Sequence, residues 1–156
     1  MSNEIRKASI EDLDLIIYFI KQLAKYEKME NQVYLQKKRL KEYLFGDRPM
    51  AEVILLLRDN KEVGFALFFH NFSTFEGKPG LYLEDLFVLP EHRGHGLGKS
   101  ALQYLANLAR ERDCARFEWV CLDWNQPSID FYVKQGASPK KEWIIFRMDG
   151  ENLKNY

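Results

Sequence analysis

Apolar positions along the chain change their spacing several times, and these changes divide it into helices and strands. Apolar side chains recur at helical spacing in three stretches, at residues 11–26, 35–45 and 97 to about 112. Shorter apolar runs predict strands at residues 5–8, 51–57, 63–71, 81–89, 117–122 and 143–148. A fourth, short helix is predicted between Asn125, which suits its N-cap, and Gly136, which suits its end.

The order of these elements predicts the topology. Short turns at residues 58–61 and 77–80 join three consecutive strands, which should therefore be antiparallel. The strands on either side of the long helix at 97–112 should be parallel, because a helical crossover joins them. We therefore predict an α/β (α+β) fold, with a mixed, mostly antiparallel central sheet flanked by helices. No linker or repeat divides residues 1–156, so we expect a single domain.

Composition and charge limit the classes of partner that the protein is expected to bind. The chain has 23 basic and 23 acidic residues, so no net charge favours a nucleic-acid or anionic-membrane partner. No apolar run approaches the length of a membrane span, and the N-terminus lacks a leader pattern. Cys114 and Cys121 lie seven residues apart on what the pattern indicates is one strand, so their side chains should point to opposite faces. We expect free thiols, a cytoplasmic location and, because the histidines lack ligand spacing, no metal site.

The most informative stretch is residues 93–100, Arg-Gly-His-Gly-Leu-Gly-Lys-Ser. It follows the apolar run at 81–89 and opens directly onto the long amphipathic helix. A glycine-rich loop at a helix N-terminus presents unpaired amides where the helix dipole favours an anion. The segment therefore predicts a phosphate-binding site.

Several phosphate ligands fit such a loop to different degrees. A nucleotide P-loop needs a glycine five positions before Gly98, where this chain has Arg93. A dinucleotide site needs G-x-G-x-x-G after a first strand, whereas this chain has G-x-G-x-G after a hairpin. A purely structural glycine turn stays open. The pattern R-x-x-G-x-G, through Arg93, Gly96 and Gly98, favours coenzyme A, because glycines permit close approach to a pyrophosphate and the arginine adds charge.

Together with the order of strands, this motif resembles the GNAT acyltransferase superfamily. The resemblance implies that the strands at 81–89 and 117–122 splay apart, and that the pantetheine arm of acetyl-CoA lies between them as a surrogate strand. It implies backbone contacts to that arm from Leu86, Phe87 and Val88. It implies that the pyrophosphate is held by Arg93, Gly94, His95, Gly96, Leu97, Gly98 and Lys99.

Three segments resemble one group of that superfamily, the diamine and polyamine (spermidine/spermine and thialysine) N-acetyltransferases. They are residues 23–30 (Leu-Ala-Lys-Tyr-Glu-Lys-Met-Glu), 81–85 (Leu-Tyr-Leu-Glu-Asp) and 124–132 (Trp-Asn-Gln-Pro-Ser-Ile-Asp-Phe-Tyr). The resemblance implies that Tyr132 protonates the departing thiolate and that Glu27 and Glu84 line the amine site. Further cofactor contacts are expected from Asn125, Gln126, Pro127, Ser128 and Lys134.

The residue types suit this chemistry. A phenol of pKa about 10 is a proton donor that survives neutral pH. A primary amine of pKa about 10.4 must lose a proton before it attacks, at a cost of about 4.6 kcal/mol at pH 7. Glu84 is the candidate to relay that proton through water, while Asp85 should point to the other face of the strand. The predicted amine site comprises Tyr26, Glu27, Glu84, Asp85, Glu118, Trp119, Val120 and Asp123, with Glu30 and Glu142 as further acidic candidates.

We therefore expect an acetyl-CoA-dependent N-acetyltransferase for a diamine, polyamine or lysine-like amino acid, acting by direct attack in a ternary complex. Cys121 is the one residue that suits a covalent alternative. A protein N-terminus or an aminoglycoside as substrate, or a non-catalytic acyl-CoA-binding module, are the competing hypotheses. The resemblance also implies a homodimer. The connections at 58–61 and 139–142 are short for the diamine group, which leaves the identity of the amine open.

Overall fold

A computed structural model describes residues 2–156, and in it the chain divides after Val120 into two units. Unit 1 is the part up to Val120, and unit 2 is Cys121–Tyr156. Each unit is described by itself.

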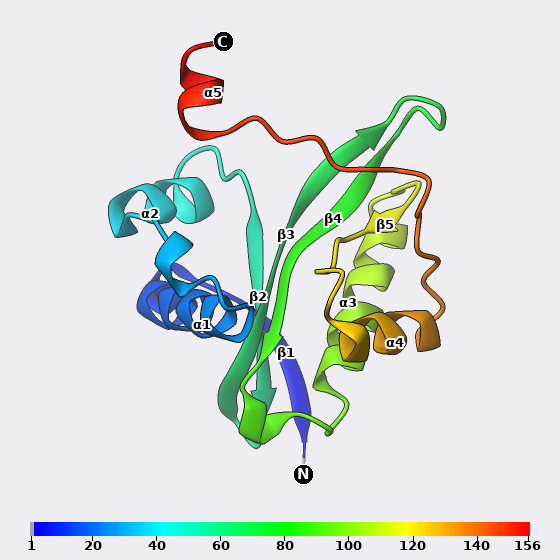
Figure 1. The fold of residues 1–156 in the computed structure, drawn as a ribbon. Coiled ribbons are helices and arrows are strands. Elements are labelled where there is room, and N and C mark those ends of the chain that lie inside the picture. Colours follow the sequence, from blue (N-terminus) through cyan, green and yellow to red (C-terminus); the bar gives the residue numbers. More distant parts are fainter. Residues whose placement is uncertain (1) are drawn as a thin grey trace. The chain divides into compact units, whose positions relative to one another are not determined.

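Unit 1 contains a five-stranded sheet whose spatial order follows the sequence (Figure 1). Its strands are β1 (Asn3–Lys7), β2 (Glu52–Arg58), β3 (Lys61–Ser73), β4 (Lys78–Val88) and β5 (Phe117–Glu118). The first four strands pair antiparallel, and β4 pairs with β5 in parallel. The predicted mixed, mostly antiparallel sheet is confirmed. The turn expected at 77–80 lies at 74–77 instead, because Pro79 and Gly80 already pair with β3.

Three helices cover this sheet, with α1 and α2 on one side and α3 on the other (Figure 1). They are α1 (Leu13–Tyr26), α2 (Lys37–Phe45) and α3 (Leu97–Glu111), each preceded by a short 3-10 turn: η1 (Ile10–Asp12), η2 (Glu30–Gln32) and η3 (Pro90–His92). At the start of the first helical stretch, the Ser9 N–H donates to the Asp12 carboxylate at 2.8 Å. All three amphipathic helices predicted for this unit are therefore confirmed.

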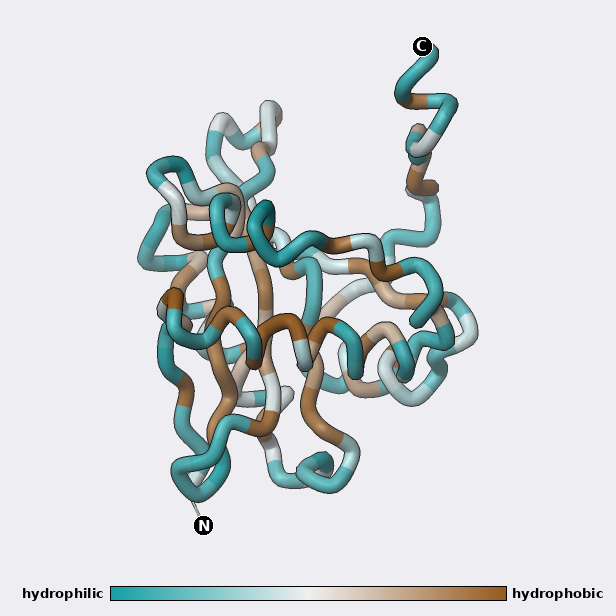
Figure 2. The backbone as a smooth tube through the Cα atoms, turned by 90° about the vertical axis from the view of Figure 1, so that its left-hand side faces the viewer, coloured by the Kyte–Doolittle hydropathy of each residue, from teal (hydrophilic) through white to brown (hydrophobic). Residues whose placement is uncertain are grey.

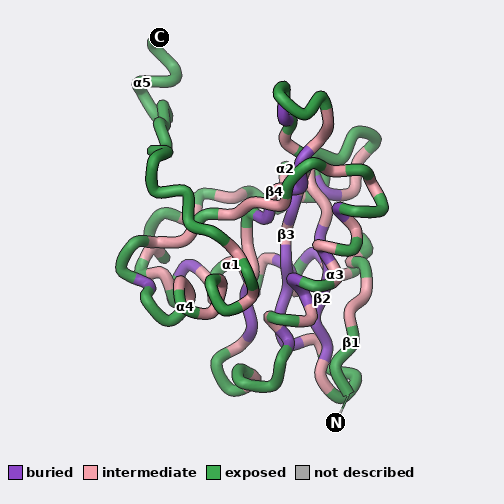
Figure 3. The backbone as a smooth tube through the Cα atoms, turned by 90° about the vertical axis from the view of Figure 1, so that its right-hand side faces the viewer, coloured by how far each residue is buried: buried purple, intermediate pink, exposed green. Residues whose placement is uncertain are grey.

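One core cluster of unit 1 packs α1 and α2 against the sheet, and α3 buries a second set of apolar side chains; buried and apolar positions run along these elements (Figures 2 and 3). Phe19 of α1 stacks on Phe65 of β3, with ring centroids 5.8 Å apart and planes 7° from parallel. Both side chains are inaccessible to solvent. This burial stabilises the packing of the helix on the sheet by several kcal/mol, since each fully buried aromatic side chain contributes roughly 1.5–3 kcal/mol.

A β-bulge interrupts β4 in the middle of the sheet. Leu67 of β3 pairs with Asp85, but the next residue, Phe68, pairs with Leu83, so Glu84 has no partner on β3. A bulge bends its strand and increases the local twist. The bend follows directly after the last pair between β4 and β5, which joins Tyr82 to Glu118.

The extent of the strand predicted at 117–122 is wrong. Only two residues pair with β4, Phe117 with Leu81 and Glu118 with Tyr82. Residues 119–122 are assigned to no strand, and Val120 is 56% exposed. Within unit 1, β4 therefore has no strand partner on the β5 side beyond Tyr82. The cysteines are also placed differently: Cys114 precedes β5 in a loop and Cys121 begins unit 2, so the two do not lie on one strand.

Unit 2 contains the short helices α4 (Gln126–Lys134) and α5 (Gly150–Lys154). Asn125 caps α4 as predicted, its side-chain oxygen accepting from the Ser128 N–H at 3.4 Å, and Gly136 follows with φ +100°. The strand predicted at 143–148 is wrong: these residues belong to no helix or strand, and they pair with no strand among residues 2–156. They are exposed (Figure 3), and the tail that follows contains α5.

Candidate active site

The loop between η3 and α3 has the local geometry of an anion cradle. Gly94 and Gly96 have φ of +79° and +81°, and Gly96 is the N-cap of α3. Gly96 has no side chain that could cap this helix, and the first amides of a helix have no partner within the helix itself. A Cβ at Gly94 would meet nothing within 4 Å, so backbone conformation rather than space requires the glycine.

The loop is fixed to the sheet from two sides. The side-chain amide of Asn3 donates to the carbonyl of His95 at 2.7 Å, which ties the loop to β1. Leu97 and Gly98 begin α3, with the Leu97 side chain buried and the Lys99 side chain exposed. The sequence gives no signal for the contact from Asn3, because the two residues are far apart along the chain.

Arg93, which is predicted to contact the pyrophosphate, also contacts the protein itself. Its Nε donates to the carbonyl of Val88 at 2.9 Å. Its guanidinium lies over the rings of Tyr26 and Phe87, at 4.6 and 5.4 Å from their centroids. Each such cation–π contact contributes roughly 0.5–1 kcal/mol when exposed. The side chain therefore joins the glycine loop to β4 and to the end of α1.

The strand β4 carries the residues expected to meet the pantetheine arm. Phe87 and Val88 are buried and Leu86 is half-buried, so their side chains belong to the body of unit 1. Their backbone lies on the part of β4 beyond Tyr82, where no strand of unit 1 pairs on the β5 side. An unpaired strand edge is the surface that an amide-bearing chain can extend. The residues of β4 and of the glycine loop thus fit coenzyme A, with an open edge for its arm and amides for its phosphates.

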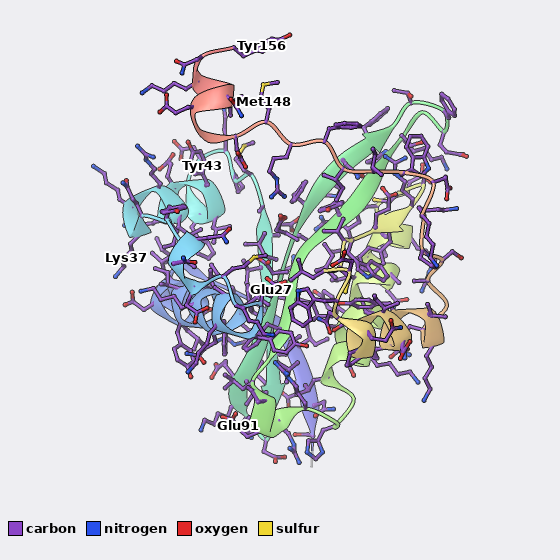
Figure 4. The ribbon with its side chains drawn as sticks, in the orientation of Figure 1. Glu27, Lys37, Tyr43, Glu91, Met148 and Tyr156 are labelled. Carbon is purple, nitrogen blue, oxygen red and sulfur yellow. The ribbon has the colours of Figure 1, made fainter. Side chains whose placement is uncertain are left out.

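Three carboxylates of unit 1 interact at the bulge: Glu27, Glu84 and Asp85. Burial, with the charges of Glu84 and Glu27 as smaller contributions, raises the pKa of Asp85 to about 7. Burial followed by the charge of Glu84 raises the pKa of Glu27, which directly follows α1 (Figure 4). Glu84 is exposed. An ammonium group is the natural partner of such a cluster, because it relieves the repulsion among the carboxylates.

The bulge changes the relation between Glu84 and Asp85. We expected them on opposite faces because side chains alternate along a regular strand. That alternation is interrupted at Glu84, the unpaired residue of the bulge, and its charge acts on Asp85. The largest pKa change in the cluster therefore belongs to Asp85, a residue that the sequence assigned only to substrate binding.

Other predicted amine-site residues of unit 1 have local partners. Glu118 forms an ion pair with Arg116 at 2.8 Å and accepts from the Asn71 amide at 3.4 Å, so its charge is already compensated. Trp119 packs against Phe117, with ring centroids 4.9 Å apart. Glu30 is exposed in η2.

In unit 2, the predicted residues gather on α4 and the turn before it. The side chain of Asn125 is buried and serves as the helix cap, and the Gln126 amide donates to Asp130 at 2.7 Å. Tyr132 is half-buried, with its ring 5.5 Å from that of Phe131. Pro127 lies in the first turn of α4 and Lys134 at its exposed end. Asp123 precedes this helix, Glu142 follows it, and both are exposed.

Residues 2–156 also show whether the chain has the features of a metal site or of a membrane span. No group of three His, Cys, Asp or Glu side chains in this range is arranged to hold a metal ion. None of the helices in the same range combines the length and the apolar character needed to cross a bilayer.

The sequence model of the Acetyltransferase (GNAT) family matches residues 17–137. The chain belongs to this family. Thialysine N-epsilon-acetyltransferase of Mus musculus is 32% identical over 98% of this chain and 96% of its own length. The protein of that name from Sus scrofa is 34% identical over 96% of this chain and 94% of its own.

Other relatives extend the comparison. The Homo sapiens spermidine/spermine N(1)-acetyltransferase-like protein 1 is 31% identical over 96% of this chain but only 23% of its own length. Among solved structures, an integron cassette protein from the mobile metagenome of V. cholerae superposes with a TM-score of 0.81, at 29% identity, over 99% of this chain and 97% of its own. An aminoglycoside acetyltransferase from a soil metagenome has a TM-score of 0.78 at 19% identity, over 93% and 94% of the two chains, which shows the shared fold.

Proposed function

We propose that this GNAT acetyltransferase transfers the acetyl group of acetyl-CoA to a primary amine of a small cationic substrate, such as a diamine, a polyamine or a lysine-like amino acid. The observation that carries the proposal is the cluster of Glu27, Glu84 and Asp85 beside the open edge of β4. The full-length likeness to proteins named thialysine acetyltransferases supports the same substrate class. We further propose one catalytic domain, since the family match crosses the boundary between the units, and a homodimer.

The carboxylates would have two tasks. They bind the substrate as an ammonium ion, and they then accept the proton that the amine must lose before it attacks the acetyl carbonyl. Asp85 suits the second task because a general base works best when its pKa lies near the operating pH, and its pKa is about 7. The exposed Glu84 would pass the proton on to solvent. Glu27, the remaining carboxylate of the cluster, would bind the second cationic group of the substrate.

The departing thiolate of coenzyme A would take a proton from the phenol of Tyr132, on α4 of unit 2. The amine attacks directly, so no acetyl group is attached to the protein. The amides at the start of α3 and the glycines at 94 and 96 would hold the pyrophosphate. Arg93 would add positive charge beside the pyrophosphate, and its ring contacts would hold the loop and Tyr26 in place.

The test is a panel of amines supplied with acetyl-CoA, with release of the free thiol as the signal. Thialysine, lysine, ornithine, putrescine and spermidine should include the best substrates. Matched monoamines of equal chain length, such as butylamine beside putrescine, should be poorer, since they lack the second cation that the carboxylates bind. Turnover only with a peptide N-terminus or an aminoglycoside would reject the proposal.

Two variants separate the roles of the carboxylates. Asp85→Asn should lower kcat/KM by about 10²–10⁴-fold, the usual contribution of a general base. Glu84→Gln should cost less if Glu84 only relays the proton. The reverse order would assign the base to Glu84, as the sequence alone suggested.

The variant Cys121→Ser separates direct attack from a covalent route. Direct attack predicts that this variant retains turnover. Loss of turnover with acetyl-CoA binding intact would favour an acetyl-enzyme.

A further inference from the structure

A cavity of about 150 Å³ lies within unit 1, at the end of the sheet where β1 stops. β1 ends at Lys7, which pairs with Ile54, so the first residues of β2 extend past the last pair between these two strands. Leu44 of α2 and Leu108 of α3 both line the cavity, although these helices lie on opposite sides of the sheet (Figure 1). The cavity therefore reaches around the edge of the sheet, in the space that a longer β1 would fill.

This cavity is separate from the candidate active site. The sheet order places β3 between β2 and β4, whereas the acidic cluster belongs to β4 and to the residue after α1. None of Glu27, Glu84, Asp85 and Arg93 lines the cavity. A ligand held here would therefore be neither the amine nor acetyl-CoA, and its binding does not depend on the proposed function.

The register of the strands places polar and apolar lining residues together on the sheet face that α3 covers. Glu52 pairs with Phe68 and Lys7 pairs with Ile54, and directly opposite residues share a face. Glu52 and Ile54 lie two residues apart on β2, so all four side chains share that face. Arg112, directly after α3, reaches Glu52 there. Ile54 and Phe68 are buried, whereas Lys7 is exposed at the rim.

Basic groups outnumber acidic ones at this rim. Both carboxylate oxygens of Glu52 accept from the Arg112 guanidinium, at 2.6 and 2.9 Å. These hydrogen bonds lower the pKa of Glu52, and the nearby charges of His70 and Lys7 act in the same direction. The Lys7 ammonium forms no ion pair with any carboxylate among residues 2–156. The rim thus has at least one positive charge more than its single carboxylate balances.

We propose that this cavity binds a small aromatic monocarboxylate, with its ring among the apolar side chains and its carboxylate at Lys7. One negative charge on the ligand matches the excess positive charge of the rim. A cationic ligand would be repelled by Lys7 and Arg112, and an inorganic anion would leave the apolar walls without a partner.

The walls and the volume select the ring. Phe45, Phe68 and Tyr104 all line the cavity, and aromatic side chains favour offset or edge-to-face contacts with another ring. An apolar protein cavity of about 150 Å³ is large enough to bind benzene. A single ring therefore suits this cavity.

An NMR titration of the full chain tests the proposal, with phenylacetate as the probe and its neutral amide, phenylacetamide, as the matched ligand. Phenylacetate should move the backbone signals of Ala8, Ala51 and Tyr104, which line the cavity, and leave those of Glu84 and Asp85 in place. It should bind about two- to fivefold more tightly than the amide, the usual effect of one exposed ion pair. Absence of binding, signals that move only at Glu84 and Asp85, or an amide that binds as tightly would overturn the proposal.

Two variants assign the contacts. Lys7→Met should remove the preference for phenylacetate while it leaves the affinity for phenylacetamide unchanged. Ala51→Leu should weaken both ligands at least about tenfold, because its side chain would occupy the volume of the ring. The control Ala115→Leu changes an exposed alanine outside the cavity and should alter neither affinity. The comparison of the two ligands needs no variant, so it decides the charge preference even if Ala51→Leu fails to fold. A folded Ala51→Leu that binds both ligands like the wild type would refute the site.

Discussion

Replacing Asp85 by asparagine should make the protein more stable at alkaline pH while it removes activity. Burial and the neighbouring charges raise the pKa of Asp85 from 3.8 to about 7 in the folded state. The folded protein therefore binds this proton more tightly than the unfolded chain does. Its stability decreases as the pH rises from about 4 through 7, and levels off once the carboxyl is ionised in both states.

The magnitude follows from the linkage between pKa and stability. Each pH unit between the two pKa values changes the free energy of unfolding by about 1.4 kcal/mol. Between pH 5 and pH 8 the Asp85 carboxyl should therefore cost the wild type about 3 kcal/mol. Asparagine does not ionise, so the difference in stability between variant and wild type should shift by that amount in favour of the variant. Any constant cost of burying the amide cancels from this comparison.

The assay is urea unfolding followed by circular dichroism at pH 5, 6, 7 and 8. A matched control is Asp12→Asn, because hydrogen bonds from Arg6 lower the pKa of Asp12 to about 2. Its stabilising contribution is lost only as the pH falls through that lower pKa, so the control should lose a similar stability at every pH of the series. An Asp85→Asn difference that stays constant from pH 5 to 8 would refute the argument that Asp85 is a buried carboxyl poised near neutrality.

Three further predictions concern other parts of the molecule. Tyr132→Phe should lower kcat by about 10²-fold or more while binding of acetyl-CoA, measured by titration calorimetry, stays nearly unchanged; an unaltered kcat would exclude the acid role. Gly96→Ala should raise the KM for acetyl-CoA and cost about 1–2 kcal/mol of stability, because φ is +81° there. Gly77→Ala at φ +65° should cost similar stability but leave KM alone, and equal KM values in the two variants would contradict a role for the glycine loop. Phe19→Ala should destabilise the fold by about 3–5 kcal/mol in urea unfolding, well beyond the loss for its half-exposed neighbour Tyr18; equal losses would contradict the assigned core.

The unit 1 fold follows closely from sequence, because local patterns determine its elements. Helical spacing of apolar side chains gives α1, α2 and α3, and the connections fix which strands run parallel. The glycine pattern locates the anion cradle for the same reason: left-handed φ at Gly94 and Gly96 is a local property of glycine.

Local sequence patterns do not predict how segments far apart in the chain pair. The bulge at Glu84 depends on how β4 pairs with β3, and Asp85, rather than the exposed Glu84, is the carboxyl whose pKa burial raises. Pairing with β4 likewise decides where β5 ends, at Glu118. The contacts of Arg93 with Tyr26 and Phe87 likewise require the packing of α1 on β4, which no local motif encodes.

The sequence by itself therefore determined the helices, the sheet topology, the phosphate-binding loop and, through its resemblance, the acetyltransferase family. Tertiary structure decided the electrostatics of the carboxylates and the orientation of Arg93, because both depend on burial and on neighbours remote in the chain. It also changed the meaning of residues 143–148. Their apolar run predicts a strand, but a strand forms only where a second strand supplies hydrogen bonds, and residues 2–156 do not supply them.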